Sequence, residues 1–573
     1  MSELSSPEIA AHVVSSLADH LTDVVLCPGS RNSALALELL AHPKLRVHVR
    51  IDERAAAFLA LGMARVTGRH VGVVMTSGTA VANCLPAVVE AQMSHTPLAI
   101  ISADRPARLV GTGASQTIDQ DGIFGVYATT TTYSPDLDFA ELFSANTVHL
   151  NIAFEDPLLP AVLPSYESGE TAGSESAEPA AAATTAATTA AASAPTLAKP
   201  QVGLVDHGVV AVDLSLDTLV IAGDEAWAVP GLEDVPTIAE PTAPAPFYPV
   251  HPLTAGLFLQ GEISTGENKD SEYAEYIAKV RPQQIIVVGH PTLHRAVFAL
   301  MSAPDLKVIT LSRTELFTDP AGVSAAKGSR VETKGKPSAQ WIKLCAALSE
   351  TAAEVVRSTL EKPELGFSGL HVAAGVADGL GVEDILVLGP SNPVRDASLV
   401  GLPFDGVETY SPRGAAGIDG VVSQAIGAAL ATQSRDADLP RAPRTVALLG
   451  DITFLHDISG LFVGENSPYP ENLTIVVAND HGGGIFESLE IGAEPLRPSF
   501  EDTVATPQRV HLESLATAYG IPYRRATNLT ELLEHLNETI EEPQGITILE
   551  AETTRVTRRE IDQQLKAALG LDK

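Results

Sequence analysis

The sequence predicts an α/β protein built from three doubly wound domains with mostly parallel sheets. Short apolar runs rich in β-branched residues alternate with longer helical patterns, which is the βαβ rhythm of a parallel sheet. These runs gather in three parts of the chain, and each run ends in glycine or polar residues. The length of 573 residues also allows several domains, at roughly 150 residues each.

The first part, residues 1–163, contains the apolar runs VVLCPG, VGVVMTSG and PLAIISADRP. The first two are followed by the helical patterns SALALELLAH and TAVANCLPAVVEAQ. We therefore expect an N-terminal α/β domain over 1–163. From 164 to 200 the composition changes abruptly to Ala, Thr, Ser and Pro, which predicts a flexible linker or surface insertion. An alanine-rich helix is the alternative, and the Thr-Thr pairs and prolines weaken it.

Two further parts repeat the βαβ rhythm. A central α/β domain is expected over 201–355, with the runs DTLVIAG, QQIIVVGHP and LKVITLSR. A C-terminal α/β domain is expected over 365–573, with DILVLGPSN, RTVALLGD, LTIVVAND and GITILEAE. Because the carboxyl ends of strands face the ligand crevice in open α/β sheets, the polar residues after these runs are the candidate site residues.

Charge and cysteine content exclude several classes of function. The chain has 37 Lys and Arg against 71 Asp and Glu, a formal net charge of −34, which argues against nucleic-acid and membrane-surface partners. The three cysteines, Cys27, Cys84 and Cys345, are far apart, so neither a disulfide framework nor a thiolate zinc site is supported. No signal-peptide pattern and no apolar stretch of roughly 18 residues is present, and we expect a cytoplasmic protein.

Several familiar motifs fail. The segment GTGASQ at 111–116 begins like a dinucleotide fingerprint but lacks its last glycine, and 328–337 does not fit the P-loop spacing. Neither HExxH nor GxSxG occurs. Nicotinamide, P-loop nucleotide and zinc-hydrolase functions are therefore disfavoured.

Polar residues follow two apolar runs of the C-terminal part. Gly450-Asp451 comes after TVALL, and Asn479-Asp480 comes after LTIVVA, with a Gly-Gly-Gly segment at 482–484 just beyond. Oxygen ligands on two adjacent strands can hold a hard divalent cation, and backbone amides exposed by glycine can approach a diphosphate. The structural alternative is that Asp451 caps a helix and Asn479 makes a turn.

Together the two motifs resemble the thiamine-diphosphate motif, which normally reads GDG to NN. The interval is 479 − 451 = 28 positions, with Ile452 in place of the third glycine and Asp480 in place of the second asparagine. The resemblance implies thiamine diphosphate as cofactor, with Mg²⁺ or Mn²⁺. The cofactor-binding residues that it implies here are Asp451, Ile452, Thr453 and Asn479, and the metal ligands are Asp451, Asp480 and Gly482.

Thiamine chemistry also needs a carboxylate at the aminopyrimidine, which this family supplies from an N-terminal α/β domain. Here IDER opens the helical run AAAFLALGMAR and places Glu53 at a helix start. The structural alternative is that acids favour a first helical turn. The resemblance implies Glu53 as the catalytic carboxylate. It also implies a thiamine-diphosphate-binding fold, with a pyrimidine-binding-type domain over 1–163 and a diphosphate-binding-type domain over 365–573.

Six segments in order make the resemblance more specific: LCPGSRNSALALE, IDERAAAFLALG, ISADRPARL, RGAAGIDG, GDITFLHD and NDHGGGIF. They are similar to the family of 2-succinyl-5-enolpyruvyl-6-hydroxy-3-cyclohexene-1-carboxylate (SEPHCHC) synthases. The resemblance implies a transferase of menaquinone biosynthesis. Such an enzyme decarboxylates 2-oxoglutarate and adds the succinyl-semialdehyde carbanion to isochorismate, giving SEPHCHC and carbon dioxide. Another thiamine-diphosphate carboligase or decarboxylase, such as an acetolactate-synthase-like enzyme, remains the alternative.

Arginines in glycine-rich or strand-end motifs support polycarboxylate substrates, because the guanidinium fork binds carboxylates in a bidentate way. A lone arginine of this kind is more often part of a surface ion pair. The substrate-binding residues that the resemblance implies are Ser30, Arg31, Arg105, Gln116, Ser391, Arg395, Arg413 and Leu489.

Apolar residues complete the expected site. The resemblance implies that Ile418 wedges the cofactor and that Ile485 and Phe486 line the reacting ring, for which ordinary core packing is the alternative. Glu53 and Asp451 lie in different predicted domains. The resemblance therefore implies a site formed between two subunits, in a homodimer or a dimer of dimers.

Overall fold

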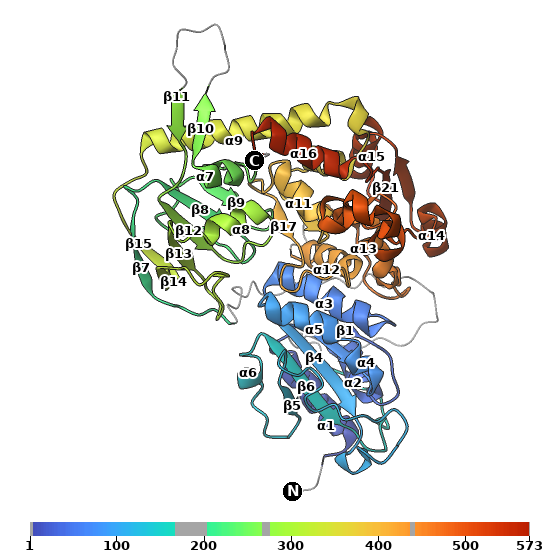
Figure 1. The fold of residues 1–573 in the computed structure, drawn as a ribbon. Helices are drawn as coiled ribbons and strands as arrows, with labels where there is room; N and C mark the ends of the chain where they lie inside the picture. The colour runs from blue at the N-terminus through green and yellow to red at the C-terminus, as the bar shows by residue number, and fades with distance from the viewer. Residues whose placement is uncertain (1–3, 167–202, 266–275, 436–441, 572–573) are drawn as a thin grey trace, which may run out of the picture.

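The computed structural model describes residues 4–166, 203–265, 276–435 and 442–571. Three α/β parts follow one another along the chain, and the N-terminal part lies against the C-terminal part through α3 and α12 (Figure 1). Within these described ranges no helix combines the length and the apolar character needed to cross a bilayer.

The N-terminal part contains a six-stranded parallel sheet of order β2-β1-β3-β4-β6-β5. Its central strands are apolar and completely buried, as expected for a parallel sheet covered on both faces. Its elements are α1 (Ser6–Leu17), β1 (Asp23–Leu26), α2 (Ser33–Ala41), β2 (Arg46–Val49), α3 (Glu53–Thr67), β3 (Val71–Met75), α4 (Thr79–Ala82), α5 (Leu85–Met93), β4 (Leu98–Asp104), β5 (Thr130–Thr132), α6 (Phe139–Leu142) and β6 (Thr147–Ala153).

The C-terminal part contains a second six-stranded parallel sheet, of order β17-β16-β18-β19-β21-β20. Numbered from its own first strand, each of these two sheets has the order 2-1-3-4-6-5, so the outer parts share one topology. Its elements are α10 (Gly369–Asp378), β16 (Ile385–Leu388), α11 (Asn392–Leu399), β17 (Glu408–Tyr410), α12 (Val421–Gln433), β18 (Thr445–Gly450), α13 (Asp451–His456), β19 (Asn472–Asn479), the 3-10 turn η4 (Gly484–Ser488), α14 (Leu512–Tyr519), β20 (Tyr523–Ala526), α15 (Leu529–Glu541), β21 (Gly545–Glu552) and α16 (Arg558–Ala568).

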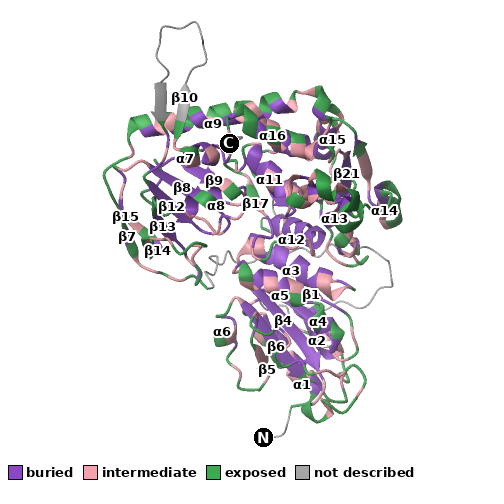
Figure 2. Ribbon diagram, in the orientation of Figure 1, coloured by how far each residue is buried: buried purple, intermediate pink, exposed green. Residues whose placement is uncertain are grey.

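The central part has a five-stranded parallel sheet of order β14-β13-β12-β8-β9, a parallel pair β15-β7 and an antiparallel pair β10-β11. In Figure 2 its sheet strands are largely buried, whereas α9 shows many exposed residues. Its elements are β7 (Val209–Asp213), β8 (Thr218–Ala222), β9 (Thr237–Ala239), α7 (Thr254–Gln260), β10 (Glu262–Thr265), β11 (Tyr276–Lys279), β12 (Gln284–Val288), α8 (Arg295–Met301), β13 (Lys307–Leu311), β14 (Ala326–Gly328), β15 (Arg330–Lys334) and α9 (Ala339–Leu360).

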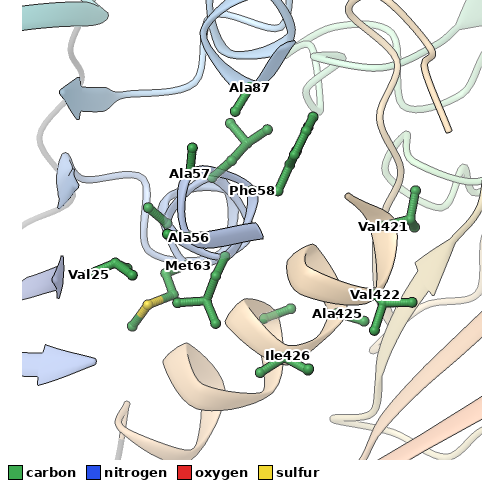
Figure 3. Packing of buried hydrophobic residues seen from close by; sticks show 14 of the residues in the cluster. Val25, Ala56, Ala57, Phe58, Met63, Ala87, Val421, Val422, Ala425 and Ile426 are labelled. Carbon is green, nitrogen blue, oxygen red and sulfur yellow. The ribbon is translucent and has the colours of Figure 1, made fainter. Parts of the chain in front are cut away.

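Helices α3 and α12 join the two outer parts in one hydrophobic cluster, in which Phe58 and Met63 of α3 lie near Val422 and Ile426 of α12 (Figure 3). The backbones approach closely, because a Cβ added at Gly62 would lie 2.2 Å from the carbonyl oxygen of Gln424. Only glycine allows this approach at the crossing.

The predicted fold class is confirmed, since most of the sheets in the three parts are parallel. All of the apolar runs quoted above as strands form strands. One helical prediction was wrong in detail: TAVANCLPAVVEAQ forms two helices, α4 and α5, because Pro86 occupies a first-turn position where a new helix begins.

The domain limits 1–163, 201–355 and 365–573 stay predictions. The predicted linker, 164–200, lies outside the described residues from 167 onward. Its beginning is attached to the N-terminal part, because the hydroxyl of Tyr166 donates to Glu38 at 2.8 Å and its ring packs on His42.

Candidate active site

The sequence-predicted residues lie after the carboxyl ends of strands in the two six-stranded sheets. In the N-terminal part they follow β1, β2 and β4, and in the C-terminal part they follow β16, β17, β18 and β19. Because all strands of each sheet are parallel, the predicted residues of each sheet lie together along the edge formed by the carboxyl ends of its strands. The edge of the N-terminal sheet carries Ser30, Arg31, Glu53, Arg105 and Gln116. The edge of the C-terminal sheet carries Ser391, Arg395, Arg413, Ile418, Asp451, Ile452, Thr453, Asn479, Asp480, Gly482, Ile485, Phe486 and Leu489.

Asp451 and Asp480 form a pair of neighbouring carboxylates at the ends of adjacent strands, since Gly450 pairs with Ala478 in the sheet. Burial raises the pKa of Asp451 to about 6. The backbone amides of Ile452 and Gly482 favour the charged form of this carboxylate and partly oppose the rise. Burial and the charge of Asp451 raise the pKa of Asp480 to about 8. A buried and a half-buried carboxylate that repel each other fit a divalent cation between them.

The glycine segment beside the pair is held by close backbone contacts. Gly482 has φ +142°, and a Cβ there would lie 2.4 Å from the carbonyl oxygen of Ala505. The described residues contain no group of three or more His, Cys, Asp or Glu side chains able to hold a metal ion. Any cation at the two aspartates therefore needs further oxygen ligands, such as the backbone carbonyl of Gly482 that the sequence predicted.

The start of α13 suits an anionic group. Asp451 is its first residue, Thr453 is buried in its first turn and Ile452 is half-buried. A Cβ added at Gly450 would meet no atom within 4 Å, so open space lies beside the strand end. Backbone amides at a helix start next to a cation site are the kind of donor that a diphosphate requires.

Asn479, predicted to bind the cofactor, already uses its side chain in two hydrogen bonds. Its side-chain nitrogen donates to Glu550 at 2.6 Å, and its side-chain oxygen accepts from the amide of His481 at 3.1 Å. The bond with His481 lies in the turn after β19, and the bond with Glu550 joins β19 to β21. The structure therefore does not show this side chain directed toward the two aspartates.

Glu53 is the first residue of α3 and is half-buried. Asp52 caps the helix instead, because its carboxylate accepts from the amides of Arg54 and Ala55. The Glu53 carboxylate does not cap the helix, and it takes part in none of the hydrogen bonds or ion pairs of the described residues. A carboxylate at a helix start that forms no such interaction is available to a ligand.

Apolar residues on the C-terminal edge stay outside the core. Ile418, Ile485, Phe486 and Leu489 are half-buried, and none of them belongs to a hydrophobic cluster of the described residues. Ile485 and Phe486 lie on η4, beside the glycine segment. Ordinary core packing, the alternative for these residues, is not what the structure shows.

Arg31 and Arg105 lie close together on the N-terminal edge. Arg31 donates to the carbonyl of Phe154 at 3.1 Å, and Arg105 donates to the carbonyl of Ser115 at 3.0 Å. Burial and the neighbouring Arg105 lower the pKa of Arg31. Neither guanidinium forms an ion pair in the described part of the chain, so a surface ion pair does not explain them.

Ser30 and Gln116 lie on the same edge. Ser30 is exposed, next to Arg31. The side chain of Gln116 donates to the backbone carbonyl of Ser77 at 3.1 Å, and the backbone carbonyl of Gln116 accepts from the hydroxyl of Ser77 at 2.8 Å. Both residues therefore border the ends of β1 and β3.

Arg395 and Arg413 form a second pair on the C-terminal edge. Arg413 is 4% exposed and donates from Nε to the hydroxyl of Thr292 at 3.0 Å, while Arg395 donates to the carbonyl of Ser391 at 2.6 Å. Burial and the charge of Arg413 lower the pKa of Arg395. No ion pair of the described residues includes either guanidinium. Two adjacent cations without a paired carboxylate fit an anionic ligand.

Backbone strain concentrates at the two edges. Ser391, directly before α11, has φ +79°, and Gln116, Ala416 and His481 also have positive φ. These are four of the eight non-glycine residues with positive φ in the described chain, and each is a predicted site residue or lies within two positions of one. Each such conformation costs on the order of 1–3 kcal/mol, and such strain is typical of functional sites.

Sequence reasoning missed three residues that support the C-terminal edge. Glu90 of α5 is buried and accepts from the amides of Gly414, Ala415 and Ala416 at 2.8, 2.7 and 3.2 Å. Thr292 of the central part accepts from Arg413 on the other side, and Glu240 accepts from the backbone amide of Thr292. Glu240 follows the strand β9, so the rule that polar residues after strands are candidates would have found it. No sequence signal distinguishes Glu90 from other glutamates in predicted helices.

Comparisons with known proteins agree with these features. Residues 7–123 match a family model described as the thiamine pyrophosphate enzyme, N-terminal TPP binding domain. The chain is 53% identical to a 2-succinyl-5-enolpyruvyl-6-hydroxy-3-cyclohexene-1-carboxylate synthase of Corynebacterium glutamicum, over 99% of both chains. It is 52% identical to the synthase of the same name from Corynebacterium diphtheriae, over 98% of this chain and 99% of the other.

A solved structure shares the fold. It is a benzoylformate decarboxylase from Polynucleobacter necessarius, which matches with a TM-score of 0.61 at 15% identity, over 96% of this chain and 99% of the other. At this identity the similarity shows the arrangement of the three parts and no more.

Proposed function

Because this chain belongs to the 2-succinyl-5-enolpyruvyl-6-hydroxy-3-cyclohexene-1-carboxylate synthase family of thiamine pyrophosphate enzymes, we propose that it catalyses the SEPHCHC synthase reaction of menaquinone biosynthesis. In this reaction 2-oxoglutarate loses carbon dioxide and its remaining four-carbon unit is joined to isochorismate. The observation that carries the proposal is the set of four arginines, Arg31 with Arg105 and Arg395 with Arg413, none of which forms an ion pair among the described residues.

The two arginine pairs match two polycarboxylate substrates. Arg31, Arg105, Ser30 and Gln116 on the N-terminal edge would bind isochorismate, and Arg395, Arg413 and Ser391 on the C-terminal edge would hold the carboxylates of 2-oxoglutarate. Guanidinium groups in a partly buried site bind carboxylates more strongly than exposed lysines do. Pyruvate, with its single carboxylate, would leave this much positive charge uncompensated.

The residues of the C-terminal edge fit the cofactor. Asp451 and Asp480, with the carbonyl of Gly482, would hold Mg²⁺ or Mn²⁺, and the amides of Ile452 and Thr453 would contact the diphosphate. The rise in pKa at both aspartates supports this role, because a cation would relieve their repulsion. When bound, thiamine diphosphate supplies the electron sink that decarboxylation of a 2-oxo acid requires.

Glu53 would hold a proton at nitrogen N1′ of the cofactor's pyrimidine. Its half-buried carboxylate has no partner among the described residues, which leaves it free for this bond. Ile418, Ile485 and Phe486 would form the apolar wall around the reacting atoms, with Leu489 on the substrate side. Such a wall excludes water and strengthens the electrostatic interactions of the charged residues.

We further propose that the site forms between two copies of the chain. Within one chain Arg54, beside Glu53, donates to the carbonyl of His456 at 2.9 Å, at the end of α13 opposite Asp451. No hydrogen bond or ion pair of the described residues joins Glu53 to Asp451 or Asp480. Ile51, two positions before Glu53, is 67% exposed, which suits a partner surface. These observations support a homodimer or a dimer of dimers.

The cell compartment follows from the same proposal. All three cysteines are free and buried, as expected for a protein kept in a reducing environment. We therefore expect the enzyme to act in the cytoplasm.

The test is an assay of purified protein with thiamine diphosphate and Mg²⁺, following the absorbance of isochorismate with and without 2-oxoglutarate. We expect the absorbance to fall only when both substrates are present, with release of carbon dioxide. Turnover of pyruvate with isochorismate left intact would instead assign the chain to the acetolactate-synthase-like enzymes.

A further inference from the structure

The loop between β12 and α8 of the central part reaches the arginine pair of the C-terminal edge. Thr292 in this loop accepts hydrogen bonds from Nε and Nη2 of Arg413 through its hydroxyl oxygen. His294 bonds the hydroxyl of Ser398 on α11 at 3.0 Å, and Leu293 packs in the hydrophobic cluster of the C-terminal part. The loop is therefore attached to the C-terminal part on the helix that also carries Arg395.

A buried carboxylate holds this loop. Oε1 of Glu240 accepts from the amides of Thr292 and Leu293 at 2.5 and 2.7 Å. Glu240 is 3% exposed, and its Oε2 is buried without a hydrogen-bond partner among the described residues. A carboxylate that is buried in this way must be stabilised by the groups around it.

The charges around Glu240 connect it with the arginine pair. Burial raises the pKa of Glu240 to about 7, the charge of Arg413 opposes this rise, and Asp224 adds to it. Glu240 also favours the charged form of Arg395. The carboxylate of Glu240, the hydroxyl of Thr292 and the guanidinium of Arg413 thus form one chain of interactions from the central part to the C-terminal edge.

We propose that Glu240 and Thr292 are positioning residues of the substrate site, through which the central part fixes the direction of the Arg413 guanidinium. The inference rests on the proposed function, because Arg413 needs a carboxylate substrate to orient. The hydroxyl of Thr292 accepts two bonds from Arg413, which leaves the other guanidinium N–H groups available to a ligand. Glu240 keeps the backbone of the loop in the conformation that presents this hydroxyl.

The test compares Thr292→Val with Thr292→Ser. Valine keeps the shape of the side chain but removes the hydroxyl, whereas serine keeps the hydroxyl. We expect Thr292→Val to raise KM for 2-oxoglutarate about tenfold, since it removes bonds to a charged group, with kcat and KM for isochorismate changed less than about threefold. Thr292→Ser restores the KM of the unchanged protein. Calorimetric titration with 2-oxoglutarate alone should show the same weakening.

Variants of Glu240 test the second step. Glu240→Ala removes the acceptor of both loop amides and should raise KM for 2-oxoglutarate as Thr292→Val does. Glu240→Gln keeps an oxygen that can accept from both amides but removes the negative charge, so it should raise KM for 2-oxoglutarate less than Glu240→Ala does. The matched control is Thr318→Val, which removes a hydroxyl bonded to His290 in the same loop at 2.9 Å but does not touch Arg413, and should leave KM unchanged.

Unchanged KM in Thr292→Val, or an equal loss of kcat and of the affinity for both substrates that serine does not rescue, would overturn the positioning role. Either result could occur in a protein that still makes SEPHCHC. If the unchanged protein failed to make SEPHCHC, the proposed function itself would be wrong, so the two failures are distinguishable.

Discussion

At the scale of single residues, charged side chains that form no direct ion pair among the described residues indicate which ligands the site binds. Arg413 is almost fully buried, yet its bonds go to a neutral hydroxyl rather than to a carboxylate. Asp480 carries a raised pKa because it is buried beside another carboxylate. Buried charged groups without a direct ion-pair partner on one sheet edge suit ligands of the opposite charge, here a carboxylate and a divalent cation.

Glu53→Gln tests the residue at the centre of the proposed chemistry. Glutamine can still approach the pyrimidine, but it cannot hold a proton there in the same way. We expect turnover to fall by about 10²- to 10⁴-fold, the usual contribution of a positioned acid or base, with affinity for thiamine diphosphate nearly unchanged. Steady-state kinetics and a cofactor titration measure the two quantities.

Asp52→Asn is the matched control for Glu53→Gln. It also removes one negative charge, from the neighbouring position, and asparagine can still cap α3. Its turnover should stay close to that of the unchanged protein. Equal turnover in Glu53→Gln and Asp52→Asn would rule out the role of Glu53.

The residue types of the site could be read from sequence motifs, but their partners could not. Asp451 and Asp480 were predicted as neighbours because each follows a strand, and the sheet does place these strands side by side. Asn479 was assigned to the cofactor from the same motif, whereas its side chain bonds Glu550, which is 71 positions away on β21. The direction of a side chain depends on such distant partners, and no local pattern encodes them.

At the scale of elements, helix α3 connects the core of the two outer parts with the predicted catalytic carboxylate. Its buried face packs on α12 through small residues, and its first residue is Glu53. The glycines at the crossing allow the helix backbones to come closer than larger residues would permit. The position of Glu53 therefore depends on how closely these two helices pack.

Gly62→Ala tests this packing. Alanine would favour the helix by about 1 kcal/mol, but its Cβ would lie 2.2 Å from the carbonyl oxygen of Gln424, so the helices must separate. We expect the free energy of unfolding to fall by about 1–3 kcal/mol, the typical cost of overpacking, as measured by urea unfolding followed by circular dichroism.

The control for Gly62→Ala is Gly379→Ala at the end of α10. There φ is −83°, and the nearest atom to an added Cβ lies 3.4 Å away, an ordinary contact. Its stability should change little. A Gly62→Ala protein as stable as Gly379→Ala would show that the α3–α12 approach is not tight.

Strands with continuous apolar runs were predictable from the sequence, and strands with partly exposed side chains were not. Apolar runs such as that of β19 are completely apolar over several residues, which is typical of a buried parallel strand. The strands β2 and β17 have four and three residues and partly exposed side chains, and they exist because β1 and β16 offer them backbone partners. Such strands form because a neighbouring strand offers backbone hydrogen bonds, and the sequence of the segment alone does not indicate this.

The whole molecule uses one topology twice. The two outer sheets share the strand order 2-1-3-4-6-5, so equivalent edges present the N-terminal and the C-terminal sets of site residues. The sequence predicted two similar α/β parts, but not this common order, because strand order follows from contacts between distant segments. For the same reason the contribution of the central part through Glu240 and Thr292 was not predicted.

The product formed from 2-oxoglutarate labelled with carbon-13 at every carbon tests the proposed function most directly. With isochorismate, thiamine diphosphate and Mg²⁺ present, mass spectrometry should find an isochorismate adduct that carries four labelled carbons, and the fifth as labelled carbon dioxide. Labelled carbon dioxide with no label joined to isochorismate would show a decarboxylase without the ligation step. That result would contradict the assignment of Arg31 and Arg105 to isochorismate.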